Sequence, residues 1–380
     1  MMNEIGVYVH FPFCRSKCLY CDFSSRPKQD RYFEAYKNAV VAEIDNSVEL
    51  PVCTINTVFF GGGTPTVLPV EYLTEIMEHI FQYAITSDAE ITVEANPGTV
   101  DLKSLRALRN AGVNRLSLGL QAWQDHLLKR MGRIHNKKDI LRSYEAAGRA
   151  GFKNINLDLM FSLPGQTMGD WTETLSAAAM LKPSHISAYS LVIEEGTAFY
   201  RLLNEGLLQL PDEEDDRRMY YAASDILSLH GYRQYEISNF ALEGKKCRHN
   251  IKYWRRRPYL GFGTDSHSFY NNTRWHNTHC INEYLHYGYK SNISGIREEI
   301  YRVTLSEAME EMMFLGLRLN CGVDKKSFYE DFGVSLTETY GEIIKKMMAS
   351  GLMDQTGDSF YLTAKGRDVS NYVLAGFLLK

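Results

Sequence analysis

The stretch YVHFPFCRSKCLYCDFSS, residues 8–25, places three of the chain's seven cysteines inside one short loop. Cys14, Cys18 and Cys21 follow an apolar run and are separated by three and then by two residues. Thiolates this close together usually hold a metal, but a closed structural zinc site takes four protein ligands. Either a fourth ligand comes from elsewhere in the chain, or one metal position is left open for a ligand that is not protein.

A structural zinc site with a fourth protein ligand is the simpler of these two alternatives. No second CxxC or HxxxH pair follows at a spacing typical of zinc, although His10 could supply a fourth ligand. An iron–sulfur cubane held by only three cysteines has one iron with an open coordination position. An open position lets a cofactor or substrate bind the metal, as it does in catalytic zinc sites. The missing fourth cysteine therefore favours a reactive cluster.

Short β-branched or aromatic runs alternate with longer amphipathic stretches in the first half of the chain. We expect strands at 5–10, 55–60, 90–95, 114–119, 154–160 and 185–191. We expect helices at 30–48, 70–83, 101–111, 136–150, 169–181 and 213–230, some of them opened by caps such as Asp101 and Asp139. Repeated βα units predict a parallel sheet with right-handed crossovers.

Polar residues follow the carboxyl ends of these expected strands. Cys14 comes after the first strand, Gly61–Gly63 after the second, and Glu94 lies at the end of the third. Gln121 follows the fourth strand, and Asp158 lies within the end of the fifth. A (β/α) barrel builds its active site from such positions. The pattern predicts an α/β fold with a partial (β/α)6 barrel, whose open side leaves room for a large substrate.

The rest of the chain divides into two parts. Residues 232–294 are rich in aromatic residues and are expected to be irregular. Residues 295–380 predict helices at 305–317, 324–331 and 335–350 and a hairpin turning at 356–358, which is a winged-helix-like arrangement. We therefore expect three domains, at 1–231, 232–294 and 295–380. Residues 291–380 hold ten Lys or Arg against thirteen Asp or Glu, which argues against DNA binding by this wing.

Composition narrows the class of protein further. The formal net charge of −4 provides no general attraction to nucleic acid or to an anionic membrane, so membrane contact would be transient and need a local patch. We expect no transmembrane segment, because eighteen apolar residues nowhere run together. The N-terminus lacks the pattern of a secretory signal, and the other four cysteines are scattered, unlike a disulfide framework. A cytoplasmic protein is expected.

CxxxCxxC with an aromatic residue before the last cysteine resembles the signature of the radical S-adenosylmethionine (SAM) superfamily. The resemblance implies that Cys14, Cys18 and Cys21 bind a [4Fe–4S] cluster whose fourth iron is chelated by SAM. One-electron reduction of the cluster by a reductant protein would then split the bound SAM. The resemblance also implies a set of residues around SAM and the cluster: Tyr8, Tyr20, Gly62, Gly63, Thr64, Glu94, Gln121, Arg133 and Asp158.

The glycine run supports this assignment on physical grounds. Gly61, Gly62 and Gly63 follow an expected strand and precede Thr64. A turn without Cβ atoms can expose its backbone N–H and C=O groups to a closely bound ligand. We expect these groups to face SAM.

The whole chain resembles the oxygen-independent coproporphyrinogen III oxidase group, through FFGGGTPT, VEANP, NINLDLMFSLPGQT and HNIKYW. Oxidases of that group carry a further cysteine two residues after the third, where this chain has Phe23, and a longer N-terminal arm. CDF after the cluster loop and the HNxxYW segment are instead similar to the HemW-type heme chaperones. That resemblance implies heme binding and transfer to acceptor proteins such as respiratory enzymes. The alternatives are oxidative decarboxylation of coproporphyrinogen III and another radical SAM reaction on a planar substrate.

The HNxxYW segment also suggests where heme would bind. His249 is followed by Tyr253, Trp254 and the arginines at 255–257. Imidazole is a common heme ligand, and arginine can pair a propionate through two hydrogen bonds. We therefore expect His249 to be the axial ligand, with four competing candidates: His267, His276, His279 and Cys247.

Overall fold

The computed structural model describes residues 3–290 and 293–379. Six parallel strands lie side by side in chain order: β1 (Asn3–Phe11), β4 (Cys53–Gly62), β5 (Ile85–Ala95), β6 (Arg115–Gln121), β7 (Asn154–Phe161) and β8 (His185–Ser190). This order confirms the six expected strands and the partial (β/α)6 barrel. Because all six strands run in the same direction, their carboxyl ends meet at one edge of the sheet.

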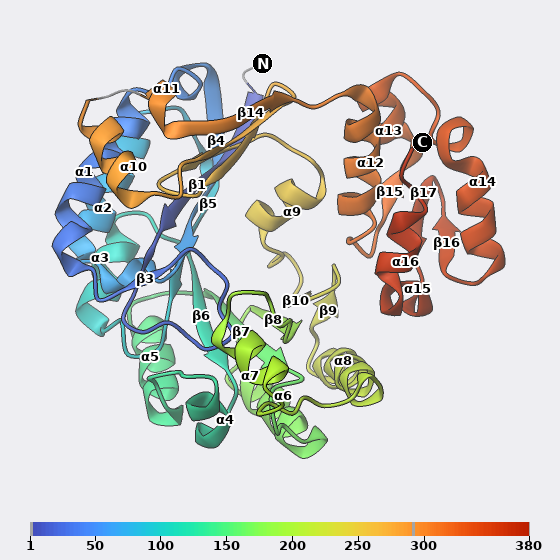
Figure 1. Cartoon of the computed structure of the whole chain (residues 1–380), viewed down its shortest axis with the longest axis horizontal. Coiled ribbons are helices and arrows are strands. Elements are labelled where there is room, and N and C mark those ends of the chain that lie inside the picture. The colour runs from blue at the N-terminus through green and yellow to red at the C-terminus, as the bar shows by residue number, and fades with distance from the viewer. Residues whose placement is uncertain (1–2, 291–292, 380) are drawn as a thin grey trace.

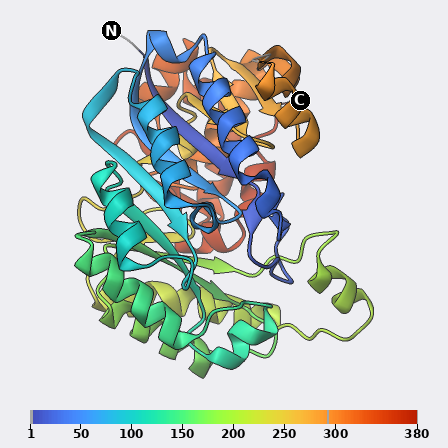
Figure 2. The same cartoon turned by 90° about the vertical axis from the view of Figure 1, so that its left-hand side faces the viewer.

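Helices cover the outer face of the sheet, as Figures 1 and 2 show. Their bounds are α1 (Phe33–Asp45), α2 (Val70–Ile80), α3 (Leu102–Asn110), α4 (Asp125–Arg130), α5 (Lys137–Arg149), α6 (Met168–Met180) and α8 (Glu213–Leu229). A further short helix, α7 (Ala198–Asn204), instead contacts the cysteine loop, where the Phe199 N–H donates to the Leu19 carbonyl (2.9 Å). Asp101 caps α3 as expected, by accepting a bond from the Ser104 backbone N–H (2.7 Å). The cap expected at Asp139 is wrong, because Asn136 caps α5 and Asp139 completes a capping box.

Residues 232–294 extend the sheet at both of its edges. Beyond β8 lie β10 (Asn239–Ala241) and β9 (Arg233–Gln234); beyond β1 lie β11 (Tyr259–Phe262), β12 (His267–Tyr270), β13 (Thr273–Asn277) and then β14 (Arg297–Arg302). The same segment contains α9 (Arg248–Trp254) and α10 (Ile281–Tyr289), and α11 (Ile293–Ile296) follows. The expectation of irregular structure is therefore wrong. The strands within 232–294 have two to five residues, too few for an alternating pattern to stand out.

The C-terminal residues form the winged-helix-like arrangement that the sequence predicts (Figure 1, right). Its elements are α12 (Leu305–Gly316), β15 (Val323–Asp324), α13 (Lys325–Phe332), α14 (Leu336–Ala349), β16 (Met353–Thr356), β17 (Ser359–Leu362), α15 (Ala364–Asp368) and α16 (Ser370–Ala375). The three strands pair in the order β15-β17-β16 around a separate apolar core that includes Met313, Phe328 and Tyr340. Across the described ranges, no helix is long and apolar enough to cross a membrane. The boundaries expected at 231 and 294 stay a prediction.

Candidate functional site

Three cysteine thiols line one cavity of about 440 Å³ at the carboxyl ends of the strands. Cys14 ends the short strand β2 (Phe13–Cys14), which pairs with β3 (Arg26–Pro27), so this pair closes the loop that carries Cys18 and Cys21. None of the three forms a disulfide. Burial raises the pKa of the Cys14 and Cys21 thiols, so a positively charged group in the cavity would be required to hold them as thiolates at neutral pH.

The positions of these thiols fit a cluster of several irons better than one metal ion. Among residues 3–290 and 293–379, no group of three His, Cys, Asp or Glu side chains is arranged to hold a single ion. The cysteines of a cubane bind different irons and need not converge on one point. His10 bonds through Nδ1 to the Tyr8 hydroxyl (3.0 Å) and through Nε2 to the Ser24 carbonyl (3.4 Å). The donor set therefore fits a [4Fe–4S] cluster, and His10 is occupied elsewhere.

The glycine turn after β4 packs directly on the cysteine strand. The N–H of Gly63 donates to the Phe11 carbonyl and that of Thr64 to the Phe13 carbonyl, each at 2.8 Å. A Cβ on Gly63 would lie 2.5 Å from the Phe13 carbonyl oxygen and 3.0 Å from the Cys14 Sγ. The expectation that these N–H groups face a ligand is wrong for Gly63 and Thr64. Glycine is needed at 63 because the two strands approach too closely for a side chain.

Replacing Gly63 with alanine is expected to lower iron loading to less than about half of the wild-type value, because the added methyl group displaces the strand that carries Cys14. Iron per chain after anaerobic reconstitution measures the effect. Gly148→Ala in α5 is the matched control, since its added Cβ meets no atom within 4 Å. Full iron loading of the Gly63→Ala variant would contradict the packing argument.

Arg133 connects the cysteine loop to the strand ends. Its guanidinium donates to the Cys18 Sγ (3.4 Å) and to the side-chain oxygen of Asn96. Asn96 donates in turn to the Thr64 hydroxyl (2.7 Å), which lies 3.5 Å from the Cys14 Sγ. Hydrogen bonds thus run from one cysteine to another through a cation. Asn96 was missed by the sequence analysis, although its place directly after β5 is the signal that could have found it.

Four further candidates from the sequence line the same cavity, namely Tyr20, Glu94, Gln121 and Asp158. Burial, and then the neighbouring Asp158 carboxylate, raise the pKa of Glu94 to about 8. Glu94 therefore carries a proton at neutral pH and can donate a hydrogen bond to a ligand hydroxyl. Asp158 is held in place because its carboxylate accepts a bond from the Ser117 hydroxyl (3.0 Å).

A second cavity of about 520 Å³ shares Phe23 with the first. Phe23 is 58% exposed, although it lies in both walls. Tyr8 lines this second cavity and not the cysteine cavity, which separates it from the other expected SAM residues. The wall also contains aromatic, basic, acidic and imidazole side chains: Tyr253, Trp254, Tyr259, Phe269, Arg256, Arg274, Asp22, Asp265, His10 and His267.

Two arginines of this second cavity are anchored by the C-terminal module. Arg256 and Arg274 pair with the two oxygens of Glu311 in α12, with Nε–oxygen distances of 2.7 and 2.8 Å. Both guanidinium carbons lie 4.6 Å from the centroid of the Phe269 ring. One carboxylate thus holds two cations in fixed positions at the cavity wall.

His249 has a structural role that disagrees with the expected one. Its Nδ1 is 2.9 Å from the Thr57 hydroxyl and its Nε2 is 2.7 Å from the Tyr253 hydroxyl, while its ring stacks on Phe59. Burial lowers the pKa of His249 to about 3, so the ring is neutral. With both nitrogens engaged, neither is free for heme iron. The geometry does not support His249 as the axial ligand, and instead shows that it fastens α9 to β4.

Comparison with known proteins places this geometry in a family. The model of the radical SAM superfamily matches residues 8–178, and that of the HemN C-terminal domain matches residues 303–369. Heme chaperone HemW of Bacillus subtilis is 39% identical, over 98% of this chain and 99% of that protein. Heme chaperone HemW of Lactococcus lactis is 35% identical, over 98% of this chain and 97% of that protein.

A solved structure shares the whole fold. Coproporphyrinogen III oxidase (HemN) of Escherichia coli, a radical SAM enzyme, superposes with a TM-score of 0.85 over 99% of this chain and 90% of that chain. Its sequence identity to this chain is 21%, so this likeness concerns the fold. The near full-length identity to the curated relatives, together with a three-cysteine cavity at the strand ends, shows that the chain belongs to the HemW family of radical SAM proteins.

Proposed function

We propose that this protein is a heme chaperone that binds one heme in the second cavity and passes it to acceptor proteins such as respiratory enzymes. The strongest support is that the second cavity adjoins the cysteine cavity, since Phe23 lines both. A flat porphyrin packs well on aromatic rings, and arginine can pair its propionates. The cavity offers aromatic rings next to the cluster site, together with Arg256 and Arg274, which Glu311 holds in position and whose remaining N–H groups would face a propionate.

His267 is the candidate that we propose as the axial ligand of heme iron. It lines the second cavity, is exposed, and makes no hydrogen bond through its ring within the described parts of the chain. Partial burial, and then His276, lower its pKa, which favours the neutral imidazole that binds iron. In contrast, His276 is engaged by the Asn277 carbonyl (3.1 Å) and Glu299 (3.4 Å), and Cys247 is buried against Glu90.

We also propose that Cys14, Cys18 and Cys21 hold the [4Fe–4S] cluster, and that SAM binds beside it in the cysteine cavity. The cluster, when bound and reduced by a partner protein, would supply one electron to SAM. Arg133 would hold the Cys18 sulfur in place, and the protonated Glu94 would donate to a ribose hydroxyl. The other residues proposed for SAM are Tyr20, Gly62, Gly63, Thr64, Gln121 and Asp158.

Separate titrations of the anaerobically reconstituted protein with heme and with coproporphyrinogen III test this function. We expect one heme per chain, detected by its Soret band, and no release of carbon dioxide when SAM and a reductant are added. Release of carbon dioxide from coproporphyrinogen III would instead show an oxidase. His267→Ala should weaken heme binding by about tenfold or more, through the loss of the iron ligand. His279→Ala is the control, since His279 is exposed and lies outside the cavity wall.

A further inference from the structure

A third cavity, of about 620 Å³, lies at the opposite end of the strands from the cysteines. Asn56 and Thr57 in the first half of β4 line it, whereas Gly62 at the end of β4 lines the cysteine cavity. Other walls come from the β9–β10 edge, from α9 and from residues 319–321 of the C-terminal module. The basic side chains in its wall are Arg233, Lys246, Arg248, Lys252, Arg255 and Arg257, whereas Glu243 is its acidic side chain.

Part of this positive charge has no counter-ion in the protein. Arg248 pairs with Asp88 (3.0 Å), Arg257 with Asp331 (3.4 Å), and Arg233 with Glu243 (3.7 Å). Within residues 3–290 and 293–379, the other three basic side chains have no carboxylate at ion-pair distance: Lys246, Lys252 and Arg255. An anion would complete this set of charges.

Lys252 shows this imbalance most clearly. Lys252 as a whole residue is 9% exposed, and within the described residues no carboxylate lies at ion-pair distance from its ammonium group. Burial lowers the pKa of Lys252 to about 8. The nearby Glu4 carboxylate opposes this shift, while Arg248 and Arg257 add smaller effects in the same direction as burial. Arg255 follows Lys252 by three residues, which places both on one side of the α9 end. Two neighbouring cations thus face the same cavity.

We propose that this cavity binds a small polyanion that carries two or more phosphate groups. Guanidinium groups match phosphate oxygens through two parallel hydrogen bonds, and a lysine adds a point charge. Asn56 and Asn320 also line the cavity, and their buried side-chain oxygens have no hydrogen-bond partner within the described residues. The cavity volume is in the usual range for small-molecule sites.

The same helix also contributes to the proposed heme cavity. Tyr253 and Trp254 of α9 line the second cavity, while Arg248, Ile251 and Lys252 line the third. The polyanion site is nevertheless independent of the proposed heme function, because none of the residues that would bind phosphate lines the other two cavities.

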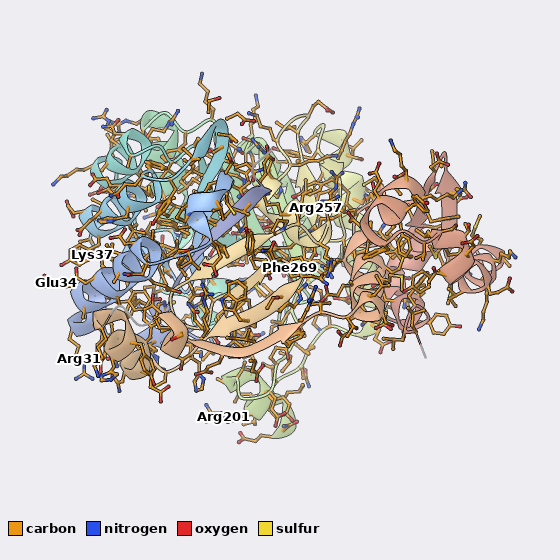
Figure 3. The ribbon with its side chains drawn as sticks, turned by 90° about the horizontal axis from the view of Figure 1, so that it is seen from above. Arg31, Glu34, Lys37, Arg201, Arg257 and Phe269 are labelled. Carbon is orange, nitrogen blue, oxygen red and sulfur yellow. The ribbon has the colours of Figure 1, made fainter. Side chains whose placement is uncertain are left out.

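Calorimetric titration of the cluster-loaded protein with tripolyphosphate, and separately with ATP, tests the proposal at low and high salt. We expect binding that weakens with salt, and a loss of about tenfold or more in Arg255→Ala. If ATP binds more tightly than tripolyphosphate, the ligand is nucleotide-like. If ATP binds equally or more weakly, the ligand is an inorganic polyphosphate. Arg201→Ala is the control, because Arg201 lies in α7, far from Arg257 (Figure 3).

Cys321 provides a second, independent measurement. Its thiol is exposed and the residue lines the third cavity, so a bound polyanion should slow alkylation of Cys321, followed by mass spectrometry of the Cys321 peptide. Three results would each overturn the proposal: no binding at millimolar ligand and low salt, equal affinity of the wild-type and Arg255→Ala proteins, or an unchanged alkylation rate.

Discussion

Replacing Cys14 with serine is expected to remove nearly all of the cluster from the reconstituted protein. Cys14 is one of three thiols in the cavity wall, and a hydroxyl is a much poorer ligand for iron than a thiolate. Iron and sulfide per chain should fall from about four each to near zero. The visible absorbance of the cluster should disappear with them.

Cys321→Ser is the matched control for this change. Cys321 is exposed, lies in the C-terminal module and is absent from the cysteine cavity, so iron loading should be unchanged. An intact cluster in the Cys14→Ser variant would refute the assignment of the cysteine loop. Circular dichroism of both variants would separate loss of the cluster from loss of the fold.

Replacing His249 with alanine is expected to lower the free energy of unfolding by about 3 kcal/mol while heme binding is retained. The substitution leaves the Thr57 and Tyr253 hydroxyls without a partner in a buried region, and it removes the ring that stacks on Phe59. Denaturation of the metal-free protein by urea measures the change in the free energy of unfolding. A heme titration measures whether heme binding is retained.

His279→Ala provides the comparison for this second prediction. Because His279 is exposed, the free energy of unfolding of this variant should hardly change. Loss of heme binding in His249→Ala without a loss of stability would support the original assignment of His249 to heme iron. His249→Gln offers a milder replacement if the alanine variant does not fold, since its amide can still bond to one of the two hydroxyls.

Local patterns account for what was predicted well. The cysteine spacing lies within eight residues, so the loop that carries it could be recognised without knowing the fold. The six parallel strands are each long enough to show a run of apolar residues, and their ends bring Gly62, Glu94 and Asp158 to one cavity. The C-terminal helices were predicted for the same reason, because each shows its own periodicity.

Contacts between distant segments account for what was missed. The strands in 232–294 are short, and they become part of the sheet only by pairing with β1 and β8. Tyr8 and His249 are of residue types that often bind cofactors. In the folded chain, however, Tyr8 is hydrogen-bonded to His10. His249 is hydrogen-bonded to Thr57 and Tyr253, and these partners determine its role. No local pattern shows which hydrogen bonds a side chain will already have made.

The sequence alone therefore determined the parallel α/β fold, the three-cysteine loop and the family, since each depends on residues close together in the chain. Only the tertiary structure decided that Phe23 lies between two cavities and that six basic residues line a third. It also decided that both ring nitrogens of His249 are hydrogen-bonded, whereas the His267 ring makes no hydrogen bond to the described residues. These features join segments up to hundreds of residues apart, and burial and hydrogen bonding between them arise only when the chain has folded.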